Sequence, residues 1–266
     1  MPSKYATVDG VATLIHHRGA TTLPGLPPDT SRGHTILCLH DAGGNGNVFS
    51  GLLDHLAESH SPLSYDQPGH GRSADLDSLG SIGAMAAHTS ALVSALELES
   101  VVLVGDGLGA AVALESAKAG WPAALVLIGG ATGVPSGLDA MVDQLAQITA
   151  GRARREFDRT GYAPETGREV YQAAFAEWIK TDPRATLGDR RAQQAWEVDT
   201  APVACPVLVL TGEHEEDDSE TAAEALAAHL AHGRCAQLVD AGRRGVNEEP
   251  AALAVTIDEF LAEVLS

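Results

Sequence analysis

The stretch Val101-Val102-Leu103-Val104-Gly105-Asp106-Gly107-Leu108-Gly109-Ala110-Ala111-Val112 decides the fold of this chain of 266 residues. Its four leading apolar residues are typical of a fully buried strand. Glycines at every second position, Gly105, Gly107 and Gly109, then predict a tight turn, and the alanine-rich run that follows predicts a helix. The stretch is therefore a strand, a sharp turn and a helix, and the turn is where we expect chemistry.

A strand, a glycine turn and a helix serve three kinds of site. One presents a nucleophile at the third position of G-x-S-x-G, one binds a dinucleotide through G-x-G-x-x-G/A, and one is the glycine-rich loop of methyltransferases. Gly105-x-Gly107-x-x-Ala110 fits the weaker form of the dinucleotide pattern. Both nucleotide sites also need an acid at the end of the next strand, where this chain has Leu127-Ile128-Gly129-Gly130. The sequence therefore favours the nucleophile turn and predicts no cofactor.

Strands and helices alternate on both sides of this stretch. Apolar runs at 35–39, 62–65, 123–128 and 207–210 are separated by segments with helical spacing, which predicts an α/β fold with a mostly parallel sheet covered on both faces. From 131 to 203 helical segments follow one another without a strand. We predict a core domain of residues 1–130 and 204–266, and a helical lid of residues 131–203 over the carboxyl ends of the strands, where ligands bind.

Composition limits the partners. A net charge of −19 argues against nucleic acid and anionic membrane surfaces, and no apolar run approaches the length of a membrane span. Cys38, Cys205 and Cys235 show neither a pairing framework nor metal spacing, so we predict no metal and a cytoplasmic location. The expected partner is a small organic substrate or ligand, and the sequence leaves the oligomeric state open.

Five segments carry motifs, in this order: Leu39-His40-Asp41-Ala42-Gly43-Gly44, 65–73 (YDQPGHGRS), 104–109 (VGDGLG), 206–214 (PVLVLTGEH) and 241–250 (AGRRGVNEEP). In the same order, they resemble five segments of the α/β-hydrolase superfamily. The first three are similar to its H-G-x-G-G oxyanion loop, its D-x-P-G-x-G-x-S loop and its V-G-H-S-L-G nucleophile turn. The last two are similar to the strand before its catalytic acid and to its A-G-H…E-x-P histidine segment. The resemblance implies the α/β-hydrolase fold, with the lid inserted before the last strands. It also implies an oxyanion site made by the backbone of Ala42 and Leu108.

The departures from these motifs bear directly on activity. Gly107 stands at the nucleophile position and Arg243 at the histidine position, while Glu215 keeps a suitable acid. Asp41 replaces the glycine of the oxyanion motif, and Asp106 precedes the nucleophile position. Glycine has no nucleophilic group and arginine stays charged, so the acyl-enzyme route lacks two groups that it needs. We therefore expect a degenerate catalytic triad.

The remaining polar residues of these loops are the candidates for chemistry. Arg243 is expected near Gly107 and paired with Glu215, with part of its guanidinium left for a carbonyl, enolate or carboxylate; the alternative is a surface arginine. Asp106 is expected to turn away from the pocket as a buried polar residue, rather than to act as a displaced nucleophile. Asp41 either reaches the pocket or bonds local backbone N–H groups.

The lid supplies four aromatic candidates for an apolar pocket, with the lid's own core as the alternative: Tyr162, Tyr171, Trp178 and Trp196. The acidic run 213–218 is predicted to be a solvated loop.

Three hypotheses of function follow from these residues. The first is a non-hydrolytic enzyme that performs cyclisation, elimination, isomerisation or lyase chemistry by proton transfer and oxyanion stabilisation. The second is a catalytically dead relative that binds a ligand or partner. The third is a hydrolase in which Asp106 or Asp41 activates water directly. We place the first hypothesis ahead of the other two.

Overall fold

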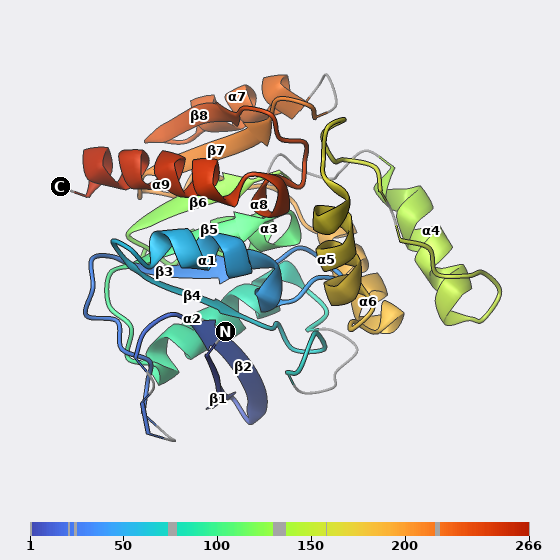
Figure 1. Cartoon of the computed structure of the whole chain (residues 1–266), viewed down its shortest axis with the longest axis horizontal. Helices are drawn as coiled ribbons and strands as arrows, with labels where there is room; N and C mark the ends of the chain where they lie inside the picture. The colour runs from blue at the N-terminus through green and yellow to red at the C-terminus, as the bar shows by residue number, and fades with distance from the viewer. Residues whose placement is uncertain are drawn as a thin grey trace.

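The computed structural model describes residues 2–20, 22–23, 26–73, 79–129, 137–157, 159–215 and 219–265 (Figure 1). The strands are β1 (Ser3–Val8), β2 (Val11–His17), β3 (Thr35–Leu39), β4 (Ser61–Tyr65), β5 (Val101–Asp106), β6 (Ala124–Ile128), β7 (Val207–Gly212) and β8 (Gly233–Leu238). The helices are η1 (Gly46–Phe49), α1 (Ser50–Leu56), α2 (Ile82–Ala95), α3 (Leu108–Ala117), α4 (Leu138–Thr149), α5 (Arg168–Trp178), α6 (Pro183–Gln194), α7 (Ser219–His229), α8 (Gly245–Glu248) and α9 (Pro250–Val264).

The strands form one sheet in the order β1-β2-β4-β3-β5-β6-β7-β8. The hairpin of β1 and β2 pairs antiparallel with β4, and all pairs from β4 to β8 are parallel. The predicted mostly parallel sheet is therefore confirmed. Parallel strands end at the same edge of a sheet, so the loops after β3, β5, β6 and β7 meet there.

Helices cover both faces of the sheet, as Figure 1 shows. Side chains alternate along β5: Leu103 packs in the core with α2, α3 and α7, whereas Val102 and Val104 pack in the core with α1 and α9. Every residue of β5 is buried. The continuous apolar run of this strand is thus explained by burial on both faces.

The two outer glycines of the central turn let α3 pass close to the sheet. A Cβ at Gly109 would lie 2.0 Å from the carbonyl oxygen of Leu39, and a Cβ at Gly105 would lie 2.3 Å from that of Gly109. No side chain fits at such distances. The G-x-G-x-G spacing therefore serves helix packing at both ends, and leaves the middle position for chemistry.

The helices α4, α5 and α6 are inserted between β6 and β7 and form the lid at the carboxyl edge of the sheet (Figure 1). Helix α4 packs on α6 through a small apolar cluster of Leu138, Val142 and Leu187. The boundary placed at residues 130 and 131 lies outside the described residues, so the division into core and lid domains stays a prediction.

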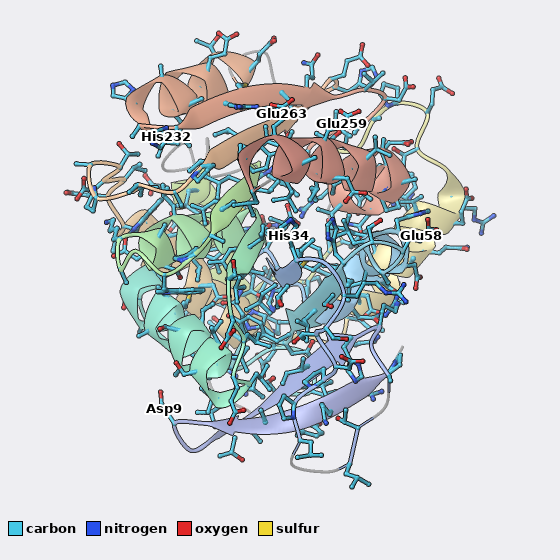
Figure 2. All side chains as sticks on the ribbon, turned by 90° about the vertical axis from the view of Figure 1, so that its left-hand side faces the viewer. Asp9, His34, Glu58, His232, Glu259 and Glu263 are labelled. Carbon is cyan, nitrogen blue, oxygen red and sulfur yellow. The ribbon has the colours of Figure 1, made fainter. Side chains whose placement is uncertain are left out.

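The outer surface carries many acidic side chains. Glu58, Glu259 and Glu263 lie exposed around α1 and α9 in Figure 2, with Asp9 at the tip of the β1–β2 hairpin. Exposed acidic side chains such as these contribute to the net charge of −19. None of the described helices has the length and apolar character needed to cross a membrane.

Candidate active site

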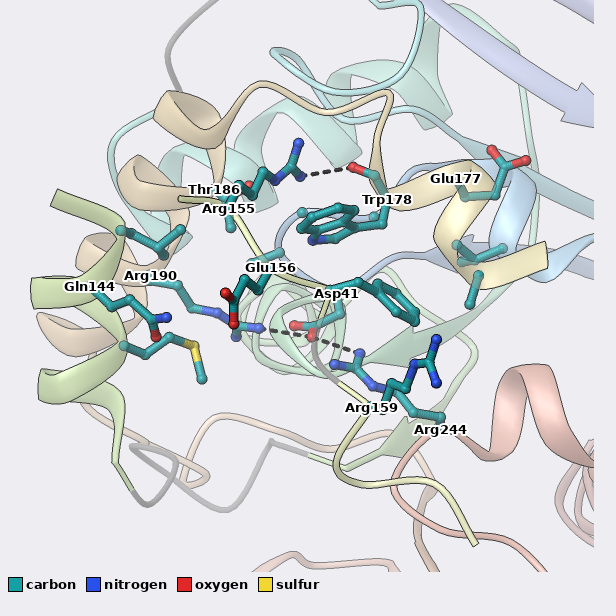
Figure 3. Close-up of a pocket in the computed structure, with 18 of the residues that line it drawn as sticks. Asp41, Gln144, Arg155, Glu156, Arg159, Glu177, Trp178, Thr186, Arg190 and Arg244 are labelled. Atoms are coloured by element: carbon teal, nitrogen blue, oxygen red, sulfur yellow. Dashed lines mark hydrogen bonds and ion pairs between the residues drawn. The ribbon is translucent and has the colours of Figure 1, made fainter. Parts of the chain in front are cut away.

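A cavity of about 620 Å³ lies between the core loops and the lid (Figure 3). The core loops contribute Asp41, Asp106 and Arg244 to its wall, and the lid contributes Tyr162 and Trp178. Open parallel sheets bind their ligands at this edge. The cavity is therefore the candidate active site.

Asp41 follows β3, and its carboxylate is held from three directions. Oδ1 accepts a hydrogen bond from the backbone N–H of Leu108 at 2.8 Å. Oδ2 lies 2.9 Å from Nη2 of Arg190 and 3.5 Å from Nη1 of Arg244 (Figure 3). Burial would raise the pKa of Asp41, but the guanidinium groups of Arg190 and Arg244 hold it well below its usual range. Asp41 is therefore a fixed anion that lies in the cavity wall, and the backbone N–H that it binds is not a local one but that of Leu108, 67 positions further along the chain.

His40 fixes the turn that carries Asp41. Nε2 of His40 accepts a hydrogen bond from the backbone N–H of Gln67 at 3.0 Å, which places the ring proton on Nδ1, and Nδ1 then donates to the carbonyl oxygen of Asp41 at 2.8 Å. Burial lowers the pKa of His40 to about 4. This histidine is neutral and structural.

Gly107 keeps the sharp turn although it has no nucleophile. Its φ is +55° and its ψ is −112°, and its N–H donates to the carbonyl oxygen of Ile128 at 2.9 Å. A Cβ at this position would lie 2.3 Å from Oδ1 of Asp41. The carboxylate of Asp41 therefore fills the space into which a side chain at position 107 would project.

The predicted oxyanion site is altered by the same carboxylate. The N–H of Leu108 points to Oδ1 of Asp41, and Ala42 lies in the cavity wall. One of the two expected amide donors is thus already bonded inside the protein. A substrate oxyanion would have to compete with Asp41 for it.

Asp106 lines the cavity, whereas the sequence predicted a side chain turned away from it. Its exposed fraction is 6%. Burial and the charge of Asp41 raise the pKa of Asp106 to about 7, with Arg244 and Arg243 acting in the opposite direction. Asp106 is therefore the group in this cavity that changes its protonation state near neutral pH.

Of the two neighbouring arginines on the loop after β8, Arg244 is the one that donates a hydrogen bond to Asp41. The Cγ of Arg243 and Oε1 of Glu215 each lie 3.4 Å from the position of a Cβ at Gly129. Arg243 and Glu215 thus lie near each other, as expected, but neither is among the described residues that line the cavity. The backbone N–H of Arg244 donates a hydrogen bond to the carbonyl oxygen of Gly161. This bond orients the turn so that the side chain of Arg244 lines the cavity.

Sequence and fold together identify the family. Residues 36–256 match the family described as "Alpha/beta hydrolase family". The chain belongs to this family. Among solved structures, the esterase EaEST from Exiguobacterium antarcticum has a TM-score of 0.83 at 17% identity, covering 98% of this chain and 100% of that chain. The enol-lactonase from Burkholderia xenovorans LB400 has a TM-score of 0.78 at 18% identity, covering 97% and 100%. Such identities establish the fold.

Curated relatives add no activity. Uncharacterized proteins of Mycobacterium bovis and Mycobacterium tuberculosis are 34% identical over 105 residues, which is 40% of this chain and 29% of those proteins. The match thus spans less than a third of the length of these relatives.

The lid of this α/β-hydrolase is joined to the core by two buried ion pairs from one turn of α6. Arg190 pairs with Asp41, and its neighbour Asp189 lies 2.9 Å from Nε2 of His70 in the D-x-P-G-x-G-x-S loop. Burial of His70 disfavours its charged form, but the carboxylate of Asp189 outweighs this effect and raises the pKa of His70. Helix α6 therefore places one charged side chain against Asp41 of the cavity wall and another against His70 of the neighbouring core loop.

The aromatic candidates separate into two groups. Tyr162 and Trp178 line the cavity, and Tyr171 packs against Tyr162 with ring centroids 4.8 Å apart. Trp196 does not line the cavity. Its indole N–H donates a hydrogen bond to Glu115 of α3 at 2.9 Å, and its ring packs against the core cluster that includes α3. Trp196 follows the end of α6, so it returns to the core and is not a pocket residue.

Sequence reasoning missed three residues of this site. Arg190 lies on the buried face of α6 among Ala185 and Gln193, and a charge on such a face was the available signal. Arg244 follows Arg243 directly in segment 241–250, and no residue pattern distinguishes the two. Glu248 accepts hydrogen bonds from the backbone of Ala163 and Gly242, so it ties the lid to the arginine loop. In the acidic run, Glu216, Asp217 and Asp218 lie outside the described residues.

Replacing Asp106 by asparagine is expected to stabilise the protein at alkaline pH. The pKa of Asp106 rises from 3.8 to about 7 on folding, so the folded state binds the proton more tightly and wild-type stability falls as pH rises through this window. The gain of Asp106→Asn in free energy of unfolding should grow between these values and reach up to about 4 kcal/mol above them. Urea denaturation at several pH values measures it; a gain that does not change with pH would contradict the assignment.

Proposed function

We propose that this α/β-hydrolase family member is a non-hydrolytic enzyme, in which Asp106 transfers a proton to or from a small organic substrate bound under the lid. The proposal rests on two carboxylates of the same cavity whose pKa values are shifted in opposite directions. Asp41 fills the place of the nucleophile as a fixed anion, and Asp106 faces the same cavity with a pKa of about 7.

The chemistry of covalent hydrolysis has no route through these residues. Gly107 has no atom that attacks a carbonyl, and the amide of Leu108 is bonded to Asp41. Arg243 and Arg244 are permanently charged and accept no proton. An acyl-enzyme would need a nucleophile, a base and a free oxyanion amide in one place.

The same residues suit proton transfer. Neighbouring carboxylates whose pKa values are driven apart are the pattern of an acid and base with separate roles. Burial, and after it the fixed charge of Asp41, keeps Asp106 protonated at mildly acidic pH, and a pKa near 7 suits proton transfer in either direction. The guanidinium of Arg244, which lines the cavity, would stabilise negative charge that develops on an enolate or carbonyl oxygen. Isomerisation, elimination, cyclisation and lyase reactions all need these two functions.

A second candidate function is ligand binding without turnover, as in a relative that has lost its activity. The bond between Asp41 and the amide of Leu108 favours it, because the protein occupies its own oxyanion position. Both candidates place a small organic molecule in the same cavity.

The test is proton exchange at carbon, measured by NMR in D₂O with a panel of 2-oxo acids and neutral ketones that carry alkyl or phenyl chains. We expect enzyme-catalysed exchange of α protons that Asp106→Asn reduces by about 100-fold or more. Exchange equal in wild type and Asp106→Asn would refute the role of Asp106. No exchange with any compound that binds would favour the second candidate.

A second assay distinguishes the proposed non-hydrolytic enzyme from a hydrolase. p-Nitrophenyl acetate and butyrate should not be turned over, and a fluorophosphonate probe should not label the protein. Covalent labelling or burst kinetics would overturn the proposal, and ester turnover without labelling would favour water activation by Asp106 or Asp41.

A further inference from the structure

We propose that the hydroxyl of Tyr162 donates a hydrogen bond to the carbonyl oxygen of the substrate, while Asp106 exchanges a proton with the neighbouring carbon. This inference rests on the proposed function, because it names the group that stabilises the enolate. It also limits the substrate to a ketone or aldehyde with a C–H bond next to its carbonyl. Three observations support it.

The first observation is the place of Tyr162 in the cavity. Tyr162 and Asp106 line the same cavity, the former from the lid and the latter from the core. The phenol lies close enough to Asp106 and Arg244 for their charges to act on it. Since Arg244 also contacts Asp41, these side chains form one cluster at the cavity wall. A small carbonyl compound beside Asp106 is thus also beside the phenol of Tyr162.

The phenol of Tyr162 is a proton donor at neutral pH. Burial raises its pKa, and the charges of Glu248 and Asp106 act in the same direction, while Arg244 acts in the opposite one. A phenol that holds its proton can donate a hydrogen bond to an oxygen that gains negative charge. Tyr162 therefore supplies a donor without adding another anion to the cavity.

The second observation is that the backbone at Tyr162 is held against the loop that carries Arg244. The carbonyl oxygen of Gly161 accepts a hydrogen bond from the backbone N–H of Arg244 at 3.2 Å. On the next turn of contact, a Cβ at Gly242 would lie 2.8 Å from the carbonyl carbon of Tyr162, so only glycine permits this approach. The lid backbone at Tyr162 is thus packed directly on the arginine loop.

Glu248 holds the same junction from the core. Its Oε1 accepts hydrogen bonds from the backbone N–H of Ala163 at 2.6 Å and from the hydroxyl of Thr166. Its Oε2 accepts from the N–H of Gly242 at 3.0 Å. The ring of Tyr162 packs against that of Tyr171, as described above. The phenol is therefore fixed in place before a substrate arrives, which is the condition under which a donor stabilises developing charge best.

The third observation is that the amide expected at the oxyanion position is engaged. The N–H of Leu108 donates to Oδ1 of Asp41 at 2.8 Å. The carboxylate of Asp41 is a fixed anion, so an enolate placed at this amide would also meet a like charge. An enolate formed beside Asp106 needs a donor on another side of the cavity. The lid residue Tyr162 provides one.

In the exchange step, the ionised carboxylate of Asp106 takes a proton from the carbon next to the carbonyl. The electron pair of that C–H bond forms the C=C bond of the enolate, and the π pair of the carbonyl moves to its oxygen. The O–H of Tyr162 stabilises this oxygen by a hydrogen bond and keeps its own proton. Return of a proton, or of a deuteron acquired from D₂O, from Asp106 to the carbon restores the carbonyl compound.

The first measurement is proton exchange by NMR in D₂O on 4-phenyl-2-butanone, compared between the wild type and Tyr162→Phe. The substitution keeps the ring and its packing on Tyr171, and it removes only the hydroxyl. We expect kcat for exchange to fall by about 100-fold and KM to change by less than about threefold, because the hydrogen bond strengthens as charge develops. Equal exchange by the two proteins would overturn the proposal.

The second measurement needs no turnover. It is the infrared C=O band of 4-phenyl-2-butanone, labelled with ¹³C at the carbonyl carbon and bound to each protein. A hydrogen bond to the oxygen lowers the stretching frequency, so the band should lie at lower frequency in the wild type than in Tyr162→Phe. The same frequency in both proteins would overturn the proposal, as would failure of the ketone to bind the wild type at up to about 10 mM.

Tyr5→Phe is the matched control, because it also removes a phenol hydroxyl. Tyr5 lies on β1, is 57% exposed and is outside the cavity wall. Its replacement should leave both the exchange rate and the band unchanged. Equal losses in Tyr5→Phe and Tyr162→Phe would contradict the assignment. So would a band that moves in Asp106→Asn and not in Tyr162→Phe, because Asp106 would then be the donor.

The two proposals fail separately. A band that differs between the wild type and Tyr162→Phe, without any exchange, would leave this hydrogen bond standing and remove the proposed enzyme activity. Exchange that depends on Asp106 and not on Tyr162 would do the opposite.

Discussion

Replacing Gly107 by alanine is expected to destabilise the protein by about 3 kcal/mol or more, because two penalties add. The new Cβ would lie 2.3 Å from Oδ1 and 2.4 Å from Cγ of Asp41, so the carboxylate would have to leave the amide of Leu108. The backbone φ of +55° with ψ of −112° is also strained for any residue with a side chain.

Gly120→Ala isolates the backbone contribution. Gly120 has a φ of +72° and no atom within 4 Å of its Cβ position, so alanine there meets only the cost of positive φ, about 1 kcal/mol. Urea denaturation of both variants gives the difference. If Gly107→Ala costs no more than Gly120→Ala, the carboxylate of Asp41 does not occupy the place of the nucleophile.

A double-mutant cycle tests the pairing of the two positions directly. In an Asp41→Gly background the obstacle is absent, so alanine at position 107 should cost about 1–3 kcal/mol less than in the wild type. The same reasoning predicts that Gly107→Ser alone creates no esterase, because serine would meet the carboxylate and find no histidine. Aspartate at position 41 and glycine at position 107 are thus one structural unit.

Replacing Arg190 by methionine is expected to lower the free energy of unfolding by about 3–5 kcal/mol. The substitution removes the guanidinium that lies 2.9 Å from Oδ2 of Asp41, and it leaves a carboxylate of 5% exposure without its nearest cation. Methionine keeps most of the side-chain volume, so the loss reports charge and not packing. The measurement is again urea denaturation.

Arg191→Met is the matched control for this variant. Arg191 is the next residue of α6 and is exposed, so its replacement should change stability by less than about 0.5 kcal/mol. Combining Arg190→Met with Asp41→Asn should recover much of the loss, since the buried charge is then removed with its partner. Equal effects of Arg190→Met and Arg191→Met would show that the lid does not control the charge of Asp41.

The architecture of this chain was predictable from its sequence. Strand and helix periods are local properties, and parallel strands separated by helices bring their carboxyl ends to one edge. Motifs far apart in the chain were therefore predicted to meet at a single site, and the loops of Asp41, Gly107 and Arg244 do meet there.

Only the tertiary structure decided which side chains make the site. Arg243 and Arg244 are neighbours on a turn, and a bond from Arg244 to Gly161 of the lid loop determines which of them reaches Asp41. Arg190 reaches Asp41 across 149 positions of the chain, a distance over which no spacing rule operates. The pKa of Asp106 depends on burial and on charges from several loops, and such through-space fields arise only when the chain has folded. The sequence by itself thus determined the fold, because strand and helix patterns follow from local residue types. Which charged side chains meet at the cavity was decided by packing, because they come from segments that only folding brings together.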